Sequence, residues 1–457
     1  MADSESRKAI RGLGWISSLA LCAASCGCSI VNRLDACDPD VQDYRVNQRV
    51  DEDEVPDGPN AILPVSNNQV LVGYTATGSQ PNQADTSSEV RVVLLSLTNG
   101  ARTTLCGDSQ GDLEKVLSSS DVYARDVSVS YSEVEGSVAA IGWTQIAADG
   151  TQGVKIVFLD GRGCPLGPGA TSPGSSVDQT DGLSLAWSPT RHALLASYED
   201  GRNVYVSWLS NLASTSAIPL EMGAIVHRTS SAIAPDGRAL VAWTASTASE
   251  GAQQHGELRA ALLDSDGTVL APSVPDAVAA PFEIDLPGDG QSIDRPLLAL
   301  TATAGRFAMA VSLAATPSEP SAVYVRQFDT SGVALGPWIR TAARAGEQQS
   351  FPSIAYAPKA SLLVTWQSSL RAGSVAQLFD QALNSRFNSI SCDEGAFDVG
   401  TRTSEQPRGY ASIASPGASA SDGEIVIVHP GQPAYDSQND GVLGWTLPFS
   451  KLWPSTR

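Results

Sequence analysis

Short apolar runs separated by turn residues repeat along most of this chain. Each repeat contains four such runs, and the second run is the easiest to align because it usually ends on an aromatic residue. These second runs end at Tyr74, Trp143, Tyr198, Trp243, Ser312, Trp366 and His429, about 59 residues apart on average. Runs of this length bounded by Gly, Pro, Asn and Asp predict strands. The pattern therefore predicts seven units of four antiparallel strands.

The turns and loops between the runs support this interpretation. Ala234-Pro235-Asp236-Gly237 lies between a first and a second run, where Pro and Gly favour a tight hairpin. The stretches between second and third runs, such as residues 75–89, vary most in length, and we expect them on one face. A small twisted sheet cannot bury its faces alone, whereas sheets stacked around an axis can. We therefore predict an all-β fold, a seven-bladed β-propeller of four-stranded antiparallel blades, over residues 59–450.

The last repeat lacks a fourth run, because only a short tail containing Pro454 follows residues 441–447. An uncovered edge would leave unpaired backbone groups. Residues 42–50 place Tyr44, Val46 and Val50 on one side of an extended segment. We expect this segment to supply the missing strand and close the ring.

The stretch Tyr324–Gln367 carries a more specific pattern. An aromatic strand ends in Phe-Asp, glycines follow, and a later strand ends in Trp-Gln. The positions that carry it are Gln327, Phe328, Asp329, Gly332, Gly336, Gln349, Pro352, Ala355, Trp366 and Gln367. This pattern resembles a repeat of bacterial secreted and surface β-propellers. The resemblance implies a propeller and an extracytoplasmic location, but no single activity. In register with the other repeats, the stretch joins the outer half of blade 5 to the inner half of blade 6.

The amino terminus has the order of a secretory signal peptide, which we predict over residues 1–25. Basic residues precede the short apolar run 12–25, and small residues precede Cys26. This resembles a bacterial lipoprotein box and predicts a lipid on Cys26, although Ala23 stands where Leu is usual. Cys22, Cys28 and ordinary secretion are the alternatives. A lipid anchor would place the protein in the cell envelope, as an outer-membrane lipoprotein or at the cell surface.

Charge narrows the classes of partner. The net charge is −20 at pH 7, and an acidic surface repels phosphate backbones, which argues against nucleic acid. Acidic residues are dense between the signal peptide and the first repeat, so we predict an acidic linker over residues 26–58.

Five cysteines follow Cys26, namely Cys28, Cys37, Cys106, Cys164 and Cys392. An exported protein meets an oxidising compartment, so disulfides are allowed. The number is odd and the spacings match no zinc or redox motif, so the sequence leaves the pairing open.

No stretch carries a recognisable catalytic motif. The chain has no GxSxG, P-loop or HExxH sequence, and its four histidines lie outside any metal-ligand spacing. We therefore predict no catalytic residue, no metal and no cofactor. The Asp and Gly residues at the third-to-fourth turns depart from the sialidase Asp-box pattern and are interpreted as turn-forming.

Two sets of residues have both a functional and a structural interpretation. Aligning the first runs places Arg125, Arg228 and Arg295 at one position near the channel mouth, where they could bind an anion. The alternative, which we favour, is that each pairs with a nearby aspartate such as Asp126. The aromatic residues that end the second runs could stack on sugars, but their place in the repeat favours packing between blades.

Three hypotheses for function follow. The first is a lipid-anchored, extracytoplasmic binding scaffold that holds a protein or glycan at its loop face. The second is a carbohydrate-active hydrolase or lyase in the central funnel, which clustered carboxylates would favour. The third is a structural component of the cell envelope, which a large apolar patch would favour.

Overall fold

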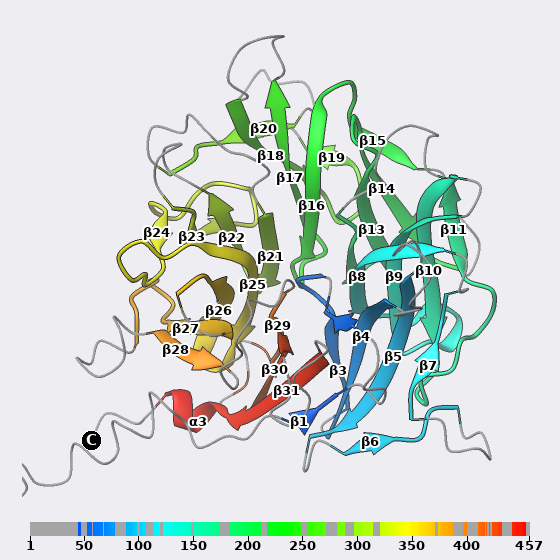
Figure 1. Cartoon of the computed structure of the whole chain (residues 1–457). Coiled ribbons are helices and arrows are strands. Elements are labelled where there is room, and N and C mark those ends of the chain that lie inside the picture. Colours follow the sequence, from blue (N-terminus) through cyan, green and yellow to red (C-terminus); the bar gives the residue numbers. More distant parts are fainter. Residues whose placement is uncertain are drawn as a thin grey trace, which may run out of the picture.

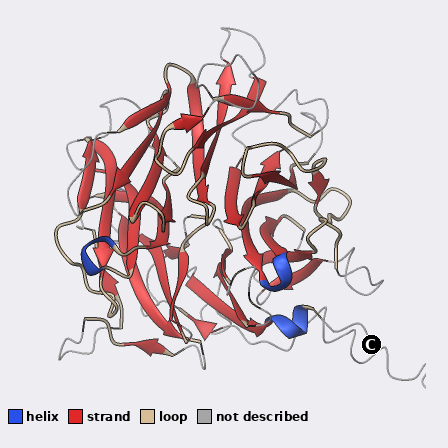
Figure 2. Ribbon diagram, turned by 180° about the vertical axis from the view of Figure 1, so that it is seen from behind, coloured by secondary structure: helices blue, strands red, loops and turns tan. Residues whose placement is uncertain are grey.

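The structure is a computed structural model in which nearly every element is a strand (Figure 2). It describes residues 44–46, 53–56, 58–66, 68–77, 88–97, 101–106, 113–118, 122–147, 150–173, 182–211, 217–247, 255–270, 281–287, 297–313, 320–370, 373–386, 396–399, 410–415, 417, 420, 423–431 and 441–453. The predicted signal peptide and Cys26 lie outside these residues. No helix of the described part is both long and apolar enough to cross a membrane.

Hydrogen bonding groups the strands into six sheets, of which the largest contains ten strands. That sheet consists of two antiparallel groups joined only by one parallel bridge, between Ser88 and Tyr123. Dividing it there leaves seven groups of strands, which we number as blades 1 to 7 in chain order.

The strands of the first four blades are as follows. Blade 1 has β3 (Ile62–Ser66), β4 (Gln69–Thr77) and β5 (Ser88–Ser96), with β2 (Asp53–Val55), β6 (Arg102–Thr103) and β7 (Lys115–Val116) beside them. Blade 2 has β8 (Tyr123–Tyr131), β9 (Ala139–Ile146), β10 (Gln152–Leu159) and β11 (Ala170–Pro173). Blade 3 has β12 (Ser184–Ser188), β13 (Ala193–Glu199), β14 (Val204–Leu209) and β15 (Ile218–Glu221). Blade 4 has β16 (Ile225–Ile233), β17 (Ala239–Thr247), β18 (His255–Leu263), β19 (Val269–Leu270) and β20 (Phe282–Ile284).

The last three blades follow the same order. Blade 5 has β21 (Leu297–Thr303), β22 (Arg306–Leu313), β23 (Ala322–Asp329) and β24 (Ile339–Arg340). Blade 6 has β25 (Gln349–Ala357), β26 (Ser361–Ser368), β27 (Gly373–Phe379) and β28 (Ala396–Val399). Blade 7 has β29 (Ser412–Ala414), β30 (Glu424–Gly431), β31 (Gly441–Pro448) and β1 (Tyr44–Arg45). The short helical elements are η1 (Val134–Gly136), η2 (Pro358–Ala360) and α3 (Phe449–Leu452).

The core lies between the blades. Buried apolar residues of the described part form seven clusters, and each cluster joins two successive blades, including blade 7 to blade 1. The aromatic residues that end the second apolar runs belong to these clusters and are at most 3% exposed, namely Tyr74, Trp143, Tyr198, Trp243 and Trp366. Their predicted role in blade packing is confirmed. The all-β, sheet-around-an-axis arrangement in Figure 1 is a β-propeller.

The first and last described strands of the chain meet in blade 7. In β1, Tyr44 and Arg45 pair antiparallel with Gly444 and Leu443 of β31. Gly444 is required at this point because a Cβ there would lie 2.3 Å from the Tyr44 ring. Val46 is fully buried in the cluster between blades 7 and 1. The fourth strand of this blade thus comes from the segment expected to close the ring (Figure 1).

The segment predicted as an acidic linker contains a strand of the first blade. β2 pairs Asp53 with Thr77 and Val55 with Thr75 of β4, inside the segment 26–58 predicted as a linker. Strand pairing uses backbone groups. A dense run of acidic side chains therefore does not prevent a segment from joining an available edge.

Serines on the inner strands bond one blade to the next. Each of these serine hydroxyls accepts a backbone N–H from another blade. The pairs of serine and N–H donor are Ser128 with Leu185, Ser184 with Ser231, Ser230 with Leu300, and Ser412 with Ala61. All four serines are at most 1% exposed. The hydroxyls satisfy N–H groups that face a neighbouring blade rather than a strand partner.

Candidate functional site

Three inner strands, those of blades 2, 4 and 6, carry a β-bulge near their first residues. Pairing shifts register after Arg125 in β8, after His227 in β16 and after Ser350 in β25. The extra residue has a positive φ each time, 55° at Asp126, 49° at Arg228 and 51° at Phe351. A bulge turns such a residue out of the ladder and toward the axis.

Two of these bulges meet in a charge cluster around a buried carboxylate, and the cluster spans three blades. Asp126 of blade 2 is 3% exposed and forms an ion pair with Arg228 of blade 4. Between them, the Gly182 N–H of blade 3 donates to Asp126 Oδ2 at 3.1 Å. The Thr144 hydroxyl donates to the same oxygen at 3.3 Å, and Arg125 Nε lies 4.0 Å from it. The cluster joins the inner ends of blades 2, 3 and 4.

The cluster changes the interpretation of the three arginines. Arg125 pairs with Thr144 and His227 pairs with Thr244, so Arg125 is equivalent to His227, and Asp126 is equivalent to Arg228. The sequence alignment is out by one residue here. Both strands carry the same bulge, so the difference comes from the connection between the first and second strands, which is longer in blade 2 than in blade 4. Arg228 and Arg125 both face Asp126, as the salt-bridge alternative expects, and Arg295 lies outside the described residues.

The opposite side of the axis is also crossed by hydrogen bonds. The Ser353 hydroxyl of blade 6 donates to the Pro59 carbonyl of blade 1 at 2.7 Å, and the Ser412 hydroxyl of blade 7 donates to the Gly58 carbonyl at 2.7 Å. Blades 6 and 1, like blades 4 and 2, are not neighbours in the ring. Hydrogen bonds therefore join described residues of blades that are not adjacent.

The described buried carboxylates are all engaged. They are Asp126, Glu199, Asp200 and Glu347, each at most 3% exposed. Glu199 accepts the Gly201 N–H, Asp200 accepts the N–H of Arg202 and Asn203, and Glu347 accepts that of Arg344. No group of His, Cys, Asp and Glu in the described part could hold a metal ion.

The aspartates of the Phe-Asp turns act as local caps. Asp329 Oδ1 accepts the N–H groups of Ser331 and Val333, both at 2.9 Å. Burial raises the pKa of Asp329, but the hydrogen bonds of Ser331 and Val333 outweigh it and hold that pKa below its usual value. Asp160 and Asp380 accept N–H groups at the same two offsets. These residues form turns.

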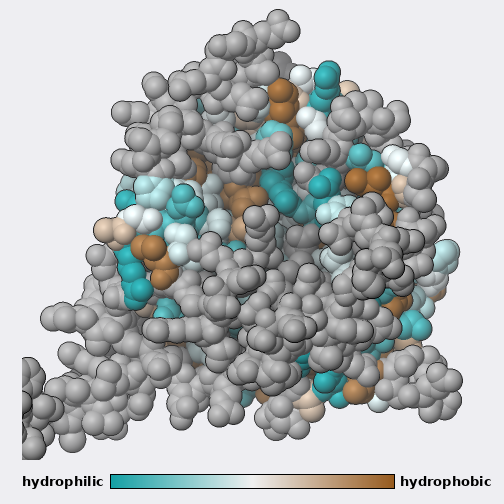
Figure 3. Space-filling view, in the orientation of Figure 1, coloured by the Kyte–Doolittle hydropathy of each residue, from teal (hydrophilic) through white to brown (hydrophobic). Residues whose placement is uncertain are grey.

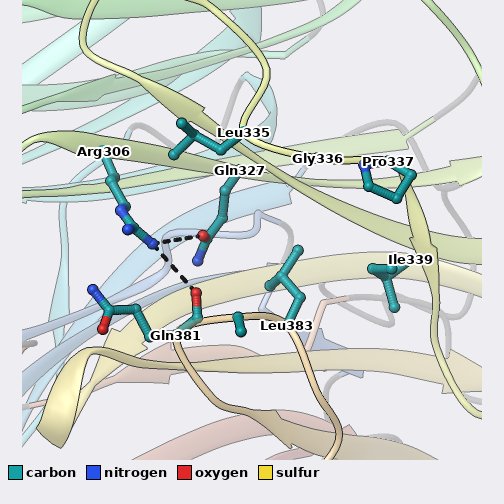
Figure 4. A pocket seen from close by; sticks show the side chains of 9 residues that line it. Arg306, Gln327, Leu335, Gly336, Pro337, Ile339, Gln381 and Leu383 are labelled. Atoms are coloured by element: carbon teal, nitrogen blue, oxygen red, sulfur yellow. Dashed lines mark hydrogen bonds between the residues drawn. The ribbon is translucent and has the colours of Figure 1, made fainter.

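A pocket that the sequence did not predict lies where blade 5 meets blade 6, on the face opposite the second-to-third loops. Its volume is about 450 Å³. One wall is apolar, with Leu335, Pro337, Ile339 and Leu383, and Leu335 is 48% exposed. The polar side holds the Arg306 guanidinium, whose Nη1 donates to Gln327 Oε1 at 3.1 Å and to the Gln381 carbonyl at 3.3 Å (Figure 4).

Gln327 departs from the repeat at this pocket. The residue two places before the turn aspartate is Phe158 in blade 2, Leu262 in blade 4 and Leu378 in blade 6, all buried. Gln327 is just as buried, at 4% exposed. A guanidinium only donates hydrogen bonds, so Gln327 must turn its oxygen to Arg306. Its Nε2 is then buried without a hydrogen-bond partner.

Two of the five cysteines beyond Cys26 lie within the described part, and they are neighbours. The Cys106 N–H donates to the Arg162 carbonyl at 3.1 Å, which places Cys106 against the turn that holds Cys164. Burial, followed by a hydrogen bond between the two thiols, raises the pKa of Cys164 to about 12. Both are unbridged and part-exposed.

Comparison with known proteins adds little to these sites. No family model and no curated protein matches the chain. Among solved structures, a protein of unknown function from Dyadobacter fermentans has a TM-score of 0.48 at 10% identity, covering 89% of this chain and 97% of its own. A polysaccharide lyase of family PL25, an ulvan lyase, scores 0.46 at 9% identity, covering 88% and 95%. The Dos1 propeller scores 0.43 at 12% identity, covering 89% and 95%. At these values the likenesses carry no argument about function.

Proposed function

We propose that this β-propeller is a non-catalytic binding scaffold, exported and held in the cell envelope by a lipid on Cys26, and that it binds a protein or small ligand at a surface site. The observation that carries the proposal is that the described buried carboxylates are all engaged with other groups of the protein. A funnel enzyme of the glycoside-cleaving kind needs two carboxyl groups free to act on a substrate. Here the described inner-strand carboxylate, Asp126, is committed to Arg228 and to the Gly182 N–H.

The described part of one face supports binding rather than a structural role. A structural envelope component would offer a large contiguous apolar patch. On the face in Figure 3, the visible described residues alternate between hydrophilic and hydrophobic in small separate patches. The pocket beside Arg306 instead combines a cation with an apolar wall, which is the usual make-up of a ligand site.

The proposal is tested on full-length protein expressed with its own amino terminus. We expect mass spectrometry to find a diacylglycerol-modified Cys26 as the first residue, and membrane fractions to contain the protein. In a Cys26→Ser variant the protein should lose the lipid and leave the membrane fraction. Cleavage elsewhere, or an unmodified Cys26, contradicts the anchor.

The non-catalytic part is tested with the same preparation. Incubation with a panel of neutral and acidic polysaccharides should release neither reducing ends nor unsaturated sugars. For the membrane-localisation test with Cys26→Ser, the matched control is Cys392→Ser, which alters a cysteine outside the predicted signal region. Steady product formation that Asp126→Asn abolishes without lowering stability would establish the hydrolase or lyase alternative.

A further inference from the structure

We propose that the pocket between blades 5 and 6 binds a small aliphatic carboxylate, with Arg306 and Gln327 holding the carboxylate group. This inference rests on the proposed binding function and names a site and a ligand class for it. The two donors converge from different strands, since Arg306 begins β22 and Gln327 lies near the end of β23. Figure 4 shows both pointing toward each other beside the apolar side chains of the pocket.

Arg306 differs from its equivalent in blade 4 in the charge of the groups that it contacts. Arg238 occupies that place and lies 3.9 Å from the carboxylate of Asp264. The two hydrogen-bond acceptors of Arg306 are both neutral, a side-chain amide oxygen and a backbone carbonyl. A guanidinium has five N–H donors, so further donors of Arg306 are available to a carboxylate oxygen.

The Gln327 amide supplies the second donor. Burying an amide N–H without an acceptor lowers stability, so a polar residue at a repeat position that is otherwise apolar calls for a compensating role. A carboxylate on Arg306 places its other oxygen beside the Gln327 side chain. Because Nε2 is covered, a lining side chain must shift as the ligand enters, a common local change on binding.

The remaining walls select the body of the ligand. Leu335, Pro337, Ile339 and Leu383 are aliphatic, and the described lining contains no aromatic ring of the kind that stacks on sugars. A protein of net charge −20 repels polyanions over long range, which disfavours acidic polysaccharides. A single carboxylate on an aliphatic body fits both facts, whether it is a free acid or the end of a peptide.

The test is calorimetric titration of the full-length protein with N-acetyl-leucine, its amide, hexanoate and glucuronate. We expect N-acetyl-leucine to bind and its amide not to bind. Arg306→Gln and Gln327→Leu should each weaken binding about tenfold or more, since each removes a charge-assisted donor. Arg238→Gln, the matched variant in blade 4, should bind normally. Hexanoate binding alone would indicate a free acid, and N-acetyl-leucine binding alone a peptide end.

A stability measurement accompanies the titration. Gln327→Leu restores the residue of blades 4 and 6, so we expect its melting temperature to rise by roughly 2 °C as the unsatisfied amide is removed. The control is Gln377→Leu, because Gln377 accepts the Ala342 N–H at 2.9 Å and donates to Ser385 at 3.0 Å. That variant should melt lower than the native protein.

Several results overturn the carboxylate site and leave the scaffold function standing. The first is that neither N-acetyl-leucine nor hexanoate binds. The second is that Arg306→Gln and Arg238→Gln weaken binding equally. The third is that glucuronate binds more tightly than N-acetyl-leucine. A fall in melting temperature for Gln327→Leu would show that the lost hydrogen bond from Arg306 outweighs the relief of the buried amide, and would remove the stability argument for the site. The scaffold function itself fails only if the polysaccharide panel is turned over.

A second inference rests on the cysteine pair. We infer that Cys106 and Cys164 form a disulfide that ties blade 1 to blade 2 in the exported protein. The turn that holds Cys164 fits the Cys106 segment closely, since a Cβ on Gly163 would lie 2.4 Å from the Leu105 side chain. Asp160 fixes the same turn by accepting the Cys164 N–H at 2.9 Å.

The reaction is a thiol–disulfide exchange. The disulfide of an envelope thiol oxidase takes two electrons and two protons from the thiols, the Cys106–Cys164 bond forms, and the oxidase is left with two thiols. The bond closes a long loop between the two blades, so it should stabilise the fold by restricting the unfolded chain.

Peptide mapping of exported protein, alkylated without reductant, tests this bond. We expect one cross-linked pair of peptides containing Cys106 and Cys164, which separates on reduction. A Cys106→Ser/Cys164→Ser variant should melt several degrees lower than oxidised protein and close to reduced protein. Exported protein with both thiols alkylated, or with either bonded to another cysteine, contradicts the pair. Failure of export is a separate result, seen in the amino-terminal analysis.

Discussion

Replacing Asp126 with Ala should lower the free energy of unfolding by about 3–5 kcal/mol. The substitution leaves Arg228 without its carboxylate and Gly182 without an acceptor for its N–H, at a site where Asp126 is only 3% exposed. Removing one partner of a buried pair is costly because the other charge stays in a poorly solvated place. Denaturant titration of the full-length protein measures the loss.

Two further variants separate the causes. Asp126→Asn keeps the shape and a hydrogen-bond acceptor but removes the charge, so it should fall between the native protein and Asp126→Ala. Asp236 also accepts a backbone N–H, from Arg238 at 3.1 Å, but lies in an exposed turn. Asp236→Ala should cost about 1 kcal/mol or less. A loss below 1 kcal/mol for Asp126→Ala would mean that the cluster does not hold the blades together, and would reopen the centre as a functional site.

Gly182→Ala should be similarly damaging, at about 2–5 kcal/mol. Gly182 has a φ of 73°, and a Cβ there would lie 2.6 Å from the Thr229 nitrogen and 2.7 Å from the Arg228 Cα. Both are backbone atoms, so the bulge of blade 4 would have to move. The positive φ costs about 1–2 kcal/mol for a residue with a side chain, and overpacking adds about 1–3.

Gly223→Ala provides the matched control. Gly223 has a φ of 79°, but a Cβ there meets nothing within 4 Å. That variant should show only the cost of the backbone conformation, about 1–2 kcal/mol. Equal losses in the two variants would exclude close packing of blades 3 and 4 at Gly182. The measurement is again the free energy of unfolding in denaturant.

These expectations together separate a structural centre from a functional surface. Variants at Asp126 and Gly182 should lose stability, because the native residues hold inner strands of three blades together. Gln327→Leu should do the opposite, gaining stability while losing ligand. That opposition is typical of binding residues, which are kept at some cost to the fold.

Some features were predictable from the sequence alone because they depend on local periodicity. The second runs lie in strands as predicted, and Trp143, Trp243 and Trp366 within those strands are buried between blades. A strand is indicated by a short run of apolar residues with turn residues on either side, so it can be predicted from that run alone. The need for a strand from residues 42–50 followed from counting runs in the last repeat.

The pocket was partly within reach of sequence reasoning. Gln327 was recognised as part of the Phe-Asp pattern, but as a residue that builds the propeller. Comparing the position two before each turn aspartate would have shown Gln327 where other blades have Phe158, Leu262 and Leu378. The missing step was to treat a departure from the repeat as a signal.

The sequence by itself determined the repeat, the strands and the turns, since each depends on residues near one another in the chain. Only the tertiary structure decided that Asp126, rather than Arg125, faces Arg228, because a one-residue bulge leaves no mark in the apolar pattern. It also decided that, among the described residues, Arg306 donates to neutral acceptors while Arg238 lies beside a carboxylate. Asp126 and Arg228 are 102 residues apart and meet only in the folded ring. The partner that each charged side chain finds there determines what the centre and the pocket can do.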